Sequence, residues 1–229
     1  MNKYIVATLK KWNIEEFKKS NLHKKKNWYF ISSPKKLTIS YIDSIKPKYI
    51  FFPHWSSKVN NKIVNKYNCV CFHETNLPYG RGGSPIQNLI IRNFKKTIIS
   101  AFKMSNQIDA GPIYLKKSLS LKGNAQKIYE RSSKIIFKMI KKIAYKKIKT
   151  KPQKGRIVLF QRRKPEQSII SKNIISLRGI YNHIRMLDAE TYPKAFIKYG
   201  KMTIEFNSPV IKKNNIDVRA SIKLKSKSK

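Results

Sequence analysis

Short runs of β-branched and aromatic residues alternate with segments of helical spacing, and this rhythm constrains the fold more than any other feature of the sequence. Strands are expected at 4–6, 28–31, 49–53, 70–73, 98–104 and 112–119, and helices at 13–20, 34–45, 59–67 and 84–94. Strands that alternate with helices favour a mostly parallel sheet with helices on both faces. The chain is therefore predicted to be an α/β protein.

The C-terminal part of the chain has a different organisation. Apolar residues from Ile128 to Ile143 recur at helical spacing and predict a long helix that closes a first domain, residues 1–150. The Lys-rich segment 146–154 is typical of a linker. Residues 151–229 are expected to form a small C-terminal domain, with a strand at 156–162, a helix at 175–187, a hairpin at 195–206 around Gly200 and a disordered basic tail after Ala220.

The net charge of +40 on 229 residues is extreme, although 41% hydrophobic residues are enough for a folded core. Such a charge by itself suggests nucleic acid or an anionic surface as a partner. Most of the basic residues are Lys, however, and Lys, Ile and Asn share A/T-rich codons, so mutational drift is the alternative explanation. On that reading nucleic acid is not the expected partner, but the excess charge still attracts folates and nucleotide phosphates.

Apolar segments and cysteines indicate the compartment. The first apolar run is short, and no other segment approaches the roughly 20 apolar residues of a membrane span, so no membrane association is expected. Cys69 and Cys71 lie too close in sequence for a disulfide of ordinary geometry. These features predict a protein of the reducing cytoplasm.

Two polar residues follow predicted strands, where open parallel sheets bind their ligands. His73 leaves one strand before a Gly-rich turn, and Asp109 lies between two tight turns. A carboxylate can orient an imidazole and stabilise its protonated form, so the two side chains together are suited to acid/base chemistry. Each also has a structural alternative, because a lone His is more often a satisfied interior residue and an Asp before Ala-Gly-Pro is an ordinary turn former.

A metal site is a rival interpretation of the same strand. Cys69, Cys71 and His73 alternate, so on one strand they share a face and offer three soft ligands. Small Cys side chains in a buried strand are more often packing residues, which is the interpretation favoured here. The Gly-rich segment that follows lacks the spacing of a P-loop or of a dinucleotide-binding turn.

The segments His73–Gln87 and Ile108–Ile113 together resemble the folate-dependent formyltransferase family, which includes methionyl-tRNA, phosphoribosylglycinamide and sugar N-formyltransferases. The family pattern runs from a His through Leu-Pro, a Gly-rich turn with Arg and Pro-Ile-Gln to a later Asp, a small residue and Gly. The resemblance implies a Rossmann-like, mostly parallel formyltransferase domain with a small C-terminal α+β extension. Residues 79–85, 161–166 and 184–196 look closest to the sugar branch.

The resemblance implies a transferase that moves a formyl group from 10-formyltetrahydrofolate to an amine. The expected acceptor is a nucleotide-linked amino sugar, a precursor of surface polysaccharide or lipopolysaccharide, since the chain lacks the Gly-rich opening usual in the tRNA enzymes. Methionyl-tRNA is the alternative acceptor, and a basic, non-enzymatic RNA-binding protein is the alternative from another class. A homodimer is one option for the oligomeric state.

The resemblance also assigns roles to residues. His73 and Asp109 would be catalytic, and no metal would be needed. The residues expected to bind the folate are Phe52, Pro53, His54, Trp55, Pro78, Tyr79, Gly80, Arg81, Gly82 and Gly83. Cys71 stands where the family has an Asn that helps to hold the oxyanion, so Asn76 or backbone N–H groups are expected to substitute for that amide.

Overall fold

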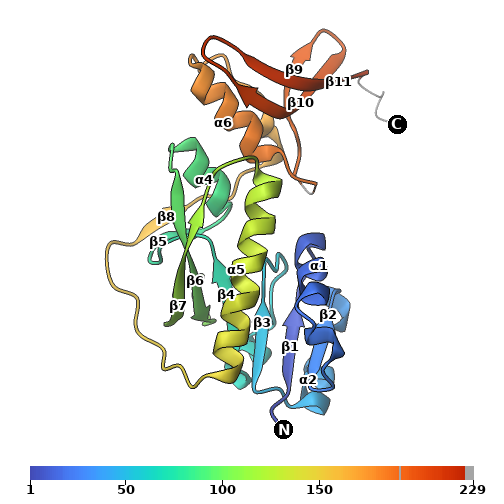
Figure 1. The fold of residues 1–229 in the computed structure, drawn as a ribbon, viewed down its shortest axis with the longest axis vertical. Helices are drawn as coiled ribbons and strands as arrows, with labels where there is room; N and C mark the ends of the chain where they lie inside the picture. Colours follow the sequence, from blue (N-terminus) through green and yellow to red (C-terminus); the bar gives the residue numbers. More distant parts are fainter. Residues whose placement is uncertain (191, 225–229) are drawn as a thin grey trace. The chain divides into compact units, whose positions relative to one another are not determined.

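A computed structural model describes residues 1–190 and 192–224 (Figure 1). These residues form two compact units. One unit comprises Met1–Gly82, Thr97–Leu119 and Tyr129–Leu159, and the other comprises Gly83–Lys96, Ser120–Ile128 and the described part of Phe160–Lys229. Each unit draws on residues from both sides of position 150. The division into domains 1–150 and 151–229 remains a prediction.

The main sheet has six strands in the order β2-β1-β3-β4-β6-β7. Their bounds are β1 (Tyr4–Ala7), β2 (Trp28–Ile31), β3 (Tyr49–Phe52), β4 (Cys69–His73), β6 (Lys96–Lys103) and β7 (Ile113–Ser120). β1 pairs in parallel with β2 and β3, and β3 pairs in parallel with β4. The predicted α/β class with a mostly parallel sheet is confirmed.

β6 runs antiparallel to β4, which the sequence pattern did not predict. Val70 pairs with Lys103, and His73 pairs with Ser100. The C-terminal end of β6 therefore lies beside the beginning of β4, whereas His73 lies at the other end of β4. The segment that follows β6 starts from the end of β4 that is opposite His73.

Apolar side chains on the strands form the core. Ile5 of β1 and Ile50 and Phe52 of the adjacent β3 have no solvent exposure and pack in one cluster with Ile42 of a covering helix. Complete burial of such a side chain contributes about 1.5–3 kcal/mol. The β-branched and aromatic runs that identified the strands are thus the residues that the sheet buries.

Helices accompany this sheet as the alternating pattern predicted. They are α1 (Lys11–Lys19), α2 (Ile39–Ile45), α3 (Asn61–Lys66) and α5 (Ala125–Tyr145), with two 3-10 turns, η1 (Leu22–Lys24) and η2 (Pro34–Lys36). α5 is the long helix expected after residue 124, and its recurrent apolar residues, among them Ile128 and Ile143, are buried. Within residues 1–190 and 192–224, no helix combines the length and apolar character that a bilayer span requires.

The single helix predicted at 34–45 is wrong. The 3-10 turn η2 ends at Lys36, and Thr38 has extended backbone angles. The Thr38 hydroxyl accepts the N–H of Tyr41 at 3.2 Å, so it caps a separate helix, α2. Side-chain capping by Thr offers the backbone an alternative to continuous helix, and this competition was not visible in the apolar spacing.

The second unit contains α4 (Pro85–Ile91), a 3-10 turn η3 (Pro165–Ser168), α6 (Leu177–Leu187) and the sheet β11-β10-β9. β9 (Ala195–Tyr199) and β10 (Met202–Ile211) form the hairpin predicted around Gly200. β11 (Ile216–Leu224) was not predicted, and the disordered tail after Ala220 is wrong for residues 221–224. Ile222 pairs with Ile204 in the antiparallel register of β10 and β11, so the backbone of this segment extends the sheet although the Ile222 side chain is exposed. Residues 225–229 lie outside the described part of the chain.

A further two-stranded sheet joins β5 (Tyr79–Gly82) and β8 (Val158–Phe160). The Gly-rich segment predicted as a turn is therefore partly an extended strand. β8 falls within the strand predicted at 156–162, and its pairing with β5 fixes the backbone beside the candidate site.

Candidate active site

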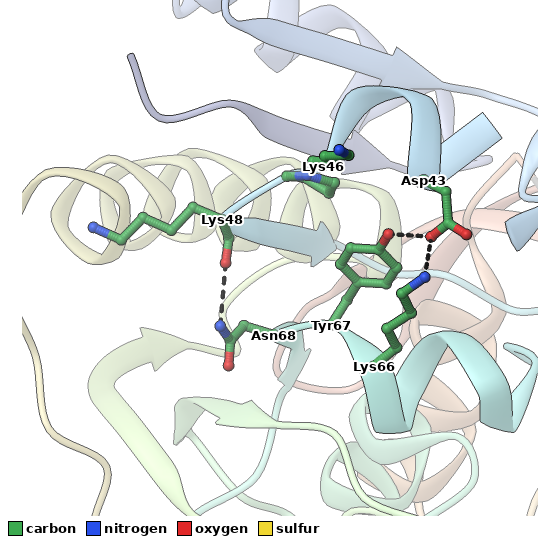
Figure 2. A pocket seen from close by; sticks show the side chains of 7 residues that line it. Asp43, Lys46, Lys48, Lys66, Tyr67 and Asn68 are labelled. Carbon is green, nitrogen blue, oxygen red and sulfur yellow. Dashed lines mark hydrogen bonds and ion pairs between the residues drawn. The ribbon is translucent and has the colours of Figure 1, made fainter. Parts of the chain in front are cut away.

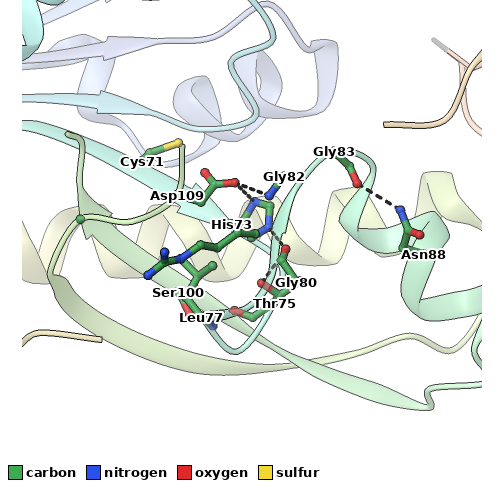
Figure 3. A network of polar contacts seen from close by, with 12 residues as sticks. Cys71, His73, Thr75, Leu77, Gly80, Gly82, Gly83, Asn88, Ser100 and Asp109 are labelled. Atoms are coloured by element: carbon green, nitrogen blue, oxygen red, sulfur yellow. Dashed lines mark hydrogen bonds and ion pairs between the residues drawn. The ribbon is translucent and has the colours of Figure 1, made fainter. Parts of the chain in front are cut away.

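His73 occupies the last position of β4, with only 9% of its side chain exposed. Its Nε2 lies 2.7 Å from the carbonyl oxygen of Gly80. Because a carbonyl only accepts, Nε2 must carry the hydrogen and donate it. The other ring nitrogen, Nδ1, faces Oδ2 of Asp109 at 3.7 Å (Figure 3). The structure thus brings together the two residues predicted to be catalytic.

Asp109 reaches His73 by a route that the sequence did not indicate. It belongs to the segment between β6 and β7, which leaves the sheet at the edge opposite His73 and returns. The argument that both residues follow parallel strands therefore fails for Asp109. Its carboxylate is fixed by the N–H of Gly82, which donates to Oδ2 at 2.9 Å, and its backbone adopts left-handed angles, with φ 51°. Asp tolerates this conformation better than most residues.

The segment that carries Asp109 is held closely to the sheet. The N–H of Lys103 donates to the carbonyl of Pro112 at 2.9 Å. A Cβ at Gly111 would lie 1.7 Å from the carbonyl oxygen of Lys103, so only glycine permits this approach. The tight turn predicted from Ala-Gly-Pro therefore has a steric cause.

Gln153 was missed by sequence reasoning. Its Nε2 donates to the carbonyls of Asp109 and Gly111, each at 2.8 Å. Its Oε1 accepts from Nε and Nη2 of Arg81 at 3.1 and 2.8 Å. One amide thus connects the Asp109 segment to the Gly-rich strand. Gln153 lies in the run predicted as a linker, where a neutral polar residue among lysines was the only signal.

Cys71, which replaces the Asn of the family pattern, is half-buried on β4. Burial, with a further contribution from Asp109, raises the pKa of its thiol well above the ordinary range, and burial raises the pKa of Cys69 to about 12. Both cysteines are free thiols. Among the described residues, no group of three or more His, Cys, Asp or Glu side chains is arranged to hold a metal ion. Asn76, the expected substitute, is exposed and accepts the Lys116 ammonium at 2.6 Å.

The first group of predicted folate residues lies where β3 ends. Phe52 and Pro53 are buried, and Phe52 belongs to the core cluster. The centroids of the Phe52 and Trp55 rings are 5.9 Å apart. His54 lies in a buried hydrogen-bond network with Glu74. Trp55 is half-buried, and its indole Nε1 is buried without a hydrogen-bond partner among residues 1–190 and 192–224. This N–H is therefore available to a ligand.

The second group follows β4. Pro78, after a cis peptide bond, and Gly80 are buried, whereas Tyr79, Arg81 and Gly82 are half-buried. The Lys116 ammonium donates to the Leu77 carbonyl at 2.8 Å, and partial burial lowers its pKa. Gly83 belongs to the second unit, where its N–H donates to the Phe160 carbonyl at 2.8 Å.

A pocket of about 580 Å³ lies elsewhere, before the beginnings of β3 and β4, at the edge of the sheet opposite His73. The Asp43 carboxylate at its side accepts from the Tyr67 hydroxyl and, at 2.8 Å, from the Lys66 ammonium (Figure 2). This carboxylate already has two donors of its own. Because Asp43 is remote from His73, its replacement can serve as a control for the loss of a carboxylate outside the candidate site.

A methionyl-tRNA formyltransferase of known structure from Clostridium thermocellum is 45% identical to this chain, with a TM-score of 0.94. The match covers 98% of this chain and 100% of that one. The chain belongs to the formyltransferase family. The family model for the methionyl-tRNA formyltransferase C-terminal domain matches residues 165–225 of this formyltransferase chain.

Other relatives are more distant. The methionyl-tRNA formyltransferase of Thermotoga maritima is 23% identical over 171 residues, covering 71% of this chain and 55% of that protein. A 4-N formyltransferase from Francisella tularensis is 18% identical, has a TM-score of 0.68 and covers 87% of this chain and 93% of that one, which shows a shared fold. The chain spans between 51% and 64% of the length of the first three curated relatives that it matches.

The predicted amino-sugar acceptor is wrong, and so are the nucleotide-sugar and lipopolysaccharide roles that depended on it. The 45% identical structure and the curated relatives are methionyl-tRNA formyltransferases, whereas the sugar formyltransferase shares only the fold. The segment 184–196, which suggested the sugar branch, lies within the matched methionyl-tRNA formyltransferase domain. Local resemblance in that segment did not separate the branches.

Proposed function

We propose that this chain transfers the formyl group of 10-formyltetrahydrofolate to the α-amino group of methionyl-tRNA. The observation that carries the proposal is the 45% identity to the Clostridium thermocellum methionyl-tRNA formyltransferase, in a match that covers 98% of this chain and 100% of that one. The His73 and Asp109 pair supports it, because transfer of an acyl group to an amine requires proton movement.

One observation supports the binding of a folate by the residues near His73. The Trp55 indole N–H is buried and lacks a partner within the described residues, and such a donor gains when a ligand acceptor reaches it. In this proposal Trp55 and the strand Tyr79–Gly82 hold the folate. When bound, 10-formyltetrahydrofolate supplies the formyl carbon and the nitrogen that leaves.

The chemistry is divided between the two catalytic side chains. Asp109 accepts the proton that the α-ammonium group must lose before its nitrogen can attack, while the Gly82 N–H keeps the Asp109 carboxylate in place. Nδ1 of His73 holds or passes a proton beside that carboxylate. A protonated His73 also stabilises negative charge on the formyl oxygen, a task to which the weak S–H donor of Cys71 adds little.

The charge of the chain supports an RNA acceptor. A net charge of +40 attracts the phosphates of a tRNA over long distances and accelerates encounter. Aminoacyl-tRNA is made where translation occurs, so this acceptor also keeps the cytoplasm as the proposed location. A small, uncharged acceptor would not be attracted by the net positive charge of the chain.

The decisive experiment incubates the protein with 10-formyltetrahydrofolate and methionyl initiator tRNA and measures N-formylmethionine after release by mass spectrometry. Free methionine and uncharged tRNA serve as controls. The proposal predicts product only with methionyl-tRNA. A protein that bound tRNA without any affinity for tetrahydrofolate and without product would overturn it and favour a non-enzymatic RNA-binding role.

A further inference from the structure

A buried hydrogen-bond network lies next to His73 and has no part in the chemistry proposed above. The side chains of His54 and Glu74 are 7% and 4% exposed, and Nε2 of His54 lies 2.5 Å from Oε1 of Glu74. His54 belongs to the turn after β3, and Glu74 immediately follows His73. The pair therefore links the two chain segments on which the proposed site depends.

The hydrogen bonds define the tautomer of His54. The indole N–H of Trp12 donates to Nδ1 at 3.0 Å, and since indole can only donate, Nδ1 carries no hydrogen. The amide Nδ2 of Asn13 lies 2.9 Å from the same atom and also donates to the Pro53 carbonyl at 3.1 Å. The hydrogen on Nε2 is therefore the one directed to Glu74. Neither ring nitrogen is left for a folate.

Glu74 anchors the pair to two other elements. Its Oε1 accepts the hydroxyl of Ser132 on α5 at 3.2 Å, and its backbone carbonyl accepts the hydroxyl of Thr97 on β6 at 3.0 Å. Burial acts to raise the pKa of this carboxyl, but His54 and the other partners outweigh it and hold the pKa below its ordinary value. Glu74 is therefore a buried carboxylate whose Oε1 is contacted by both His54 and Ser132.

The backbone of His54 gives independent support. Its φ of 47° lies in the left-handed region, which is unfavourable for a residue with a Cβ. Such a conformation persists where the surroundings over-determine it. Here both ring nitrogens are fixed from opposite sides, so the turn that presents Trp55 is held by the network.

We propose that Glu74 and His54 form a positioning pair. This pair holds the end of β4, and hence His73, at a fixed position relative to the turn that presents Trp55. Neither residue touches the reactants. The inference rests on the proposed formyl transfer and gives His54 a different role from the direct folate contact expected from the sequence.

The test uses Glu74→Ala, His54→Ala, the double variant and the conservative Glu74→Gln, with Asp43→Asn as the matched control for loss of a remote carboxylate. For each protein, calorimetry with tetrahydrofolate measures Kd, and the formylation assay measures kcat and KM, at a temperature well below unfolding. The unaltered protein is measured first. If it neither binds tetrahydrofolate nor formylates methionyl-tRNA, the proposed function itself fails, whatever the variants do.

With an active unaltered protein, each alanine variant should weaken tetrahydrofolate binding and lower kcat by about tenfold or more, because small misplacements of reacting groups are costly. The double variant should be no worse than the more damaged single variant, since its second change removes a partner that is already lost. Glu74→Gln should recover most of the loss, because its amide oxygen still accepts from His54. Asp43→Asn should match the unaltered protein.

Two results would overturn the proposal that Glu74 and His54 form a positioning pair. One is losses that multiply in the double variant, which would mean that the residues act independently. The other is unchanged Kd and kcat despite a lower Tm, which would mean a structural role alone. If Glu74→Ala fails to fold, His54→Ala and Ser132→Ala decide instead. Ser132→Ala should reduce kcat by about two- to fivefold with the fold retained, and an unchanged kcat and Kd in Ser132→Ala would reject the proposal.

Discussion

Nδ1 of His73 lies 3.7 Å from Oδ2 of Asp109, although the strand that precedes Asp109 ends at the opposite edge of the sheet. The connection after β6 must therefore return alongside β4. Close approach at Gly111 and two hydrogen bonds from Gln153 hold that return. The proposed acid/base pair thus depends on residues that have no proposed chemical role of their own.

Replacing either catalytic residue should abolish most turnover. We expect His73→Asn and Asp109→Asn each to lower kcat by about 10²- to 10⁴-fold, because general acid/base groups contribute on that scale. The double variant should lose little more, since the two residues act as one unit. Single-turnover formylation of methionyl-tRNA provides the measurement.

The same variants should still bind tetrahydrofolate, because Trp55 and the strand Tyr79–Gly82 hold the folate in the proposed mechanism. Asp43→Asn controls for loss of a carboxylate away from the site. Variants with near-normal turnover would remove His73 and Asp109 from the mechanism. Variants that fail to fold would instead support their reading as interior and turn residues.

Gly111→Ala should displace the segment that carries Asp109. The new methyl group would lie 1.7 Å from the Lys103 carbonyl oxygen, so the backbone must move, at a cost of about 1–3 kcal/mol in the free energy of unfolding. Turnover should fall with it. Gly200→Ala is the control, because its φ is +54° and its Cβ meets nothing within 4 Å, so only the left-handed strain of about 1 kcal/mol is expected. Equal stability of the two variants in denaturant titrations would contradict the steric argument.

Gln153 provides a test of the connection between Arg81 and the Asp109 segment. Gln153→Glu keeps an acceptor for Arg81 but cannot donate to the carbonyls of Asp109 and Gly111. We expect kcat to fall by about tenfold in this variant, comparable to Gln153→Ala, since the lost donor is what fixes Asp109. If Gln153→Glu were fully active while Gln153→Ala was not, the contact with Arg81 would be the important one.

Periodicity predicted the buried part of the fold well, and it failed where partners distant in sequence decide the structure. The residues after Ala220 were expected to form a disordered tail, yet Ile222 pairs with Ile204 in the antiparallel sheet. Thr38 divides a segment of even helical spacing because its hydroxyl caps a new helix. The direction of β6 leaves no trace in local spacing.

The proposed catalytic pair could be predicted because His73 and Asp109 stand in linked motifs, whereas the residues that support them could not. Gln153 lies in a run of lysines that looks like a linker, and its role exists only once Arg81 and Asp109 are folded beside it. His54 was assigned to folate through the family resemblance, but its ring nitrogens are used by Trp12 and Glu74. Hydrogen-bond partners are a property of the folded chain.

Asp188 should make the second unit sensitive to acid. Burial acts to raise the pKa of this carboxyl, but hydrogen bonds from Lys194, Asn124 and the Ser208 N–H hold it below its ordinary value of 3.8. A depressed folded pKa contributes stability that is present above the unfolded value and is lost as the pH falls through the folded pKa. Asp188→Asn should therefore be less stable than the unaltered protein at pH 7.

The difference between Asp188→Asn and the unaltered protein should shrink as the pH falls below about 3.8. Denaturant unfolding monitored at a series of pH values measures this convergence. Asp217→Asn, which removes a half-exposed ion pair with Lys212, should change stability by less than about 1 kcal/mol at neutral pH. A constant gap for Asp188→Asn across the acid range would contradict the assignment.

Salt dependence should decide whether the charge of +40 serves tRNA binding or reflects codon composition alone. A protein that neutralises six to ten phosphates loses roughly 10³- to 10⁵-fold in affinity between 50 and 200 mM salt, because bound counterions are released. We expect the Kd for methionyl-tRNA to rise in this range with a linear dependence of log Kd on log salt. The Kd for tetrahydrofolate should change far less, since few of its charges meet the protein. Both constants can be measured on one preparation, by filter binding and by calorimetry. A slope for tRNA near that of tetrahydrofolate would mean that the lysines do not contact the backbone phosphates, and drift in base composition would then account for the charge.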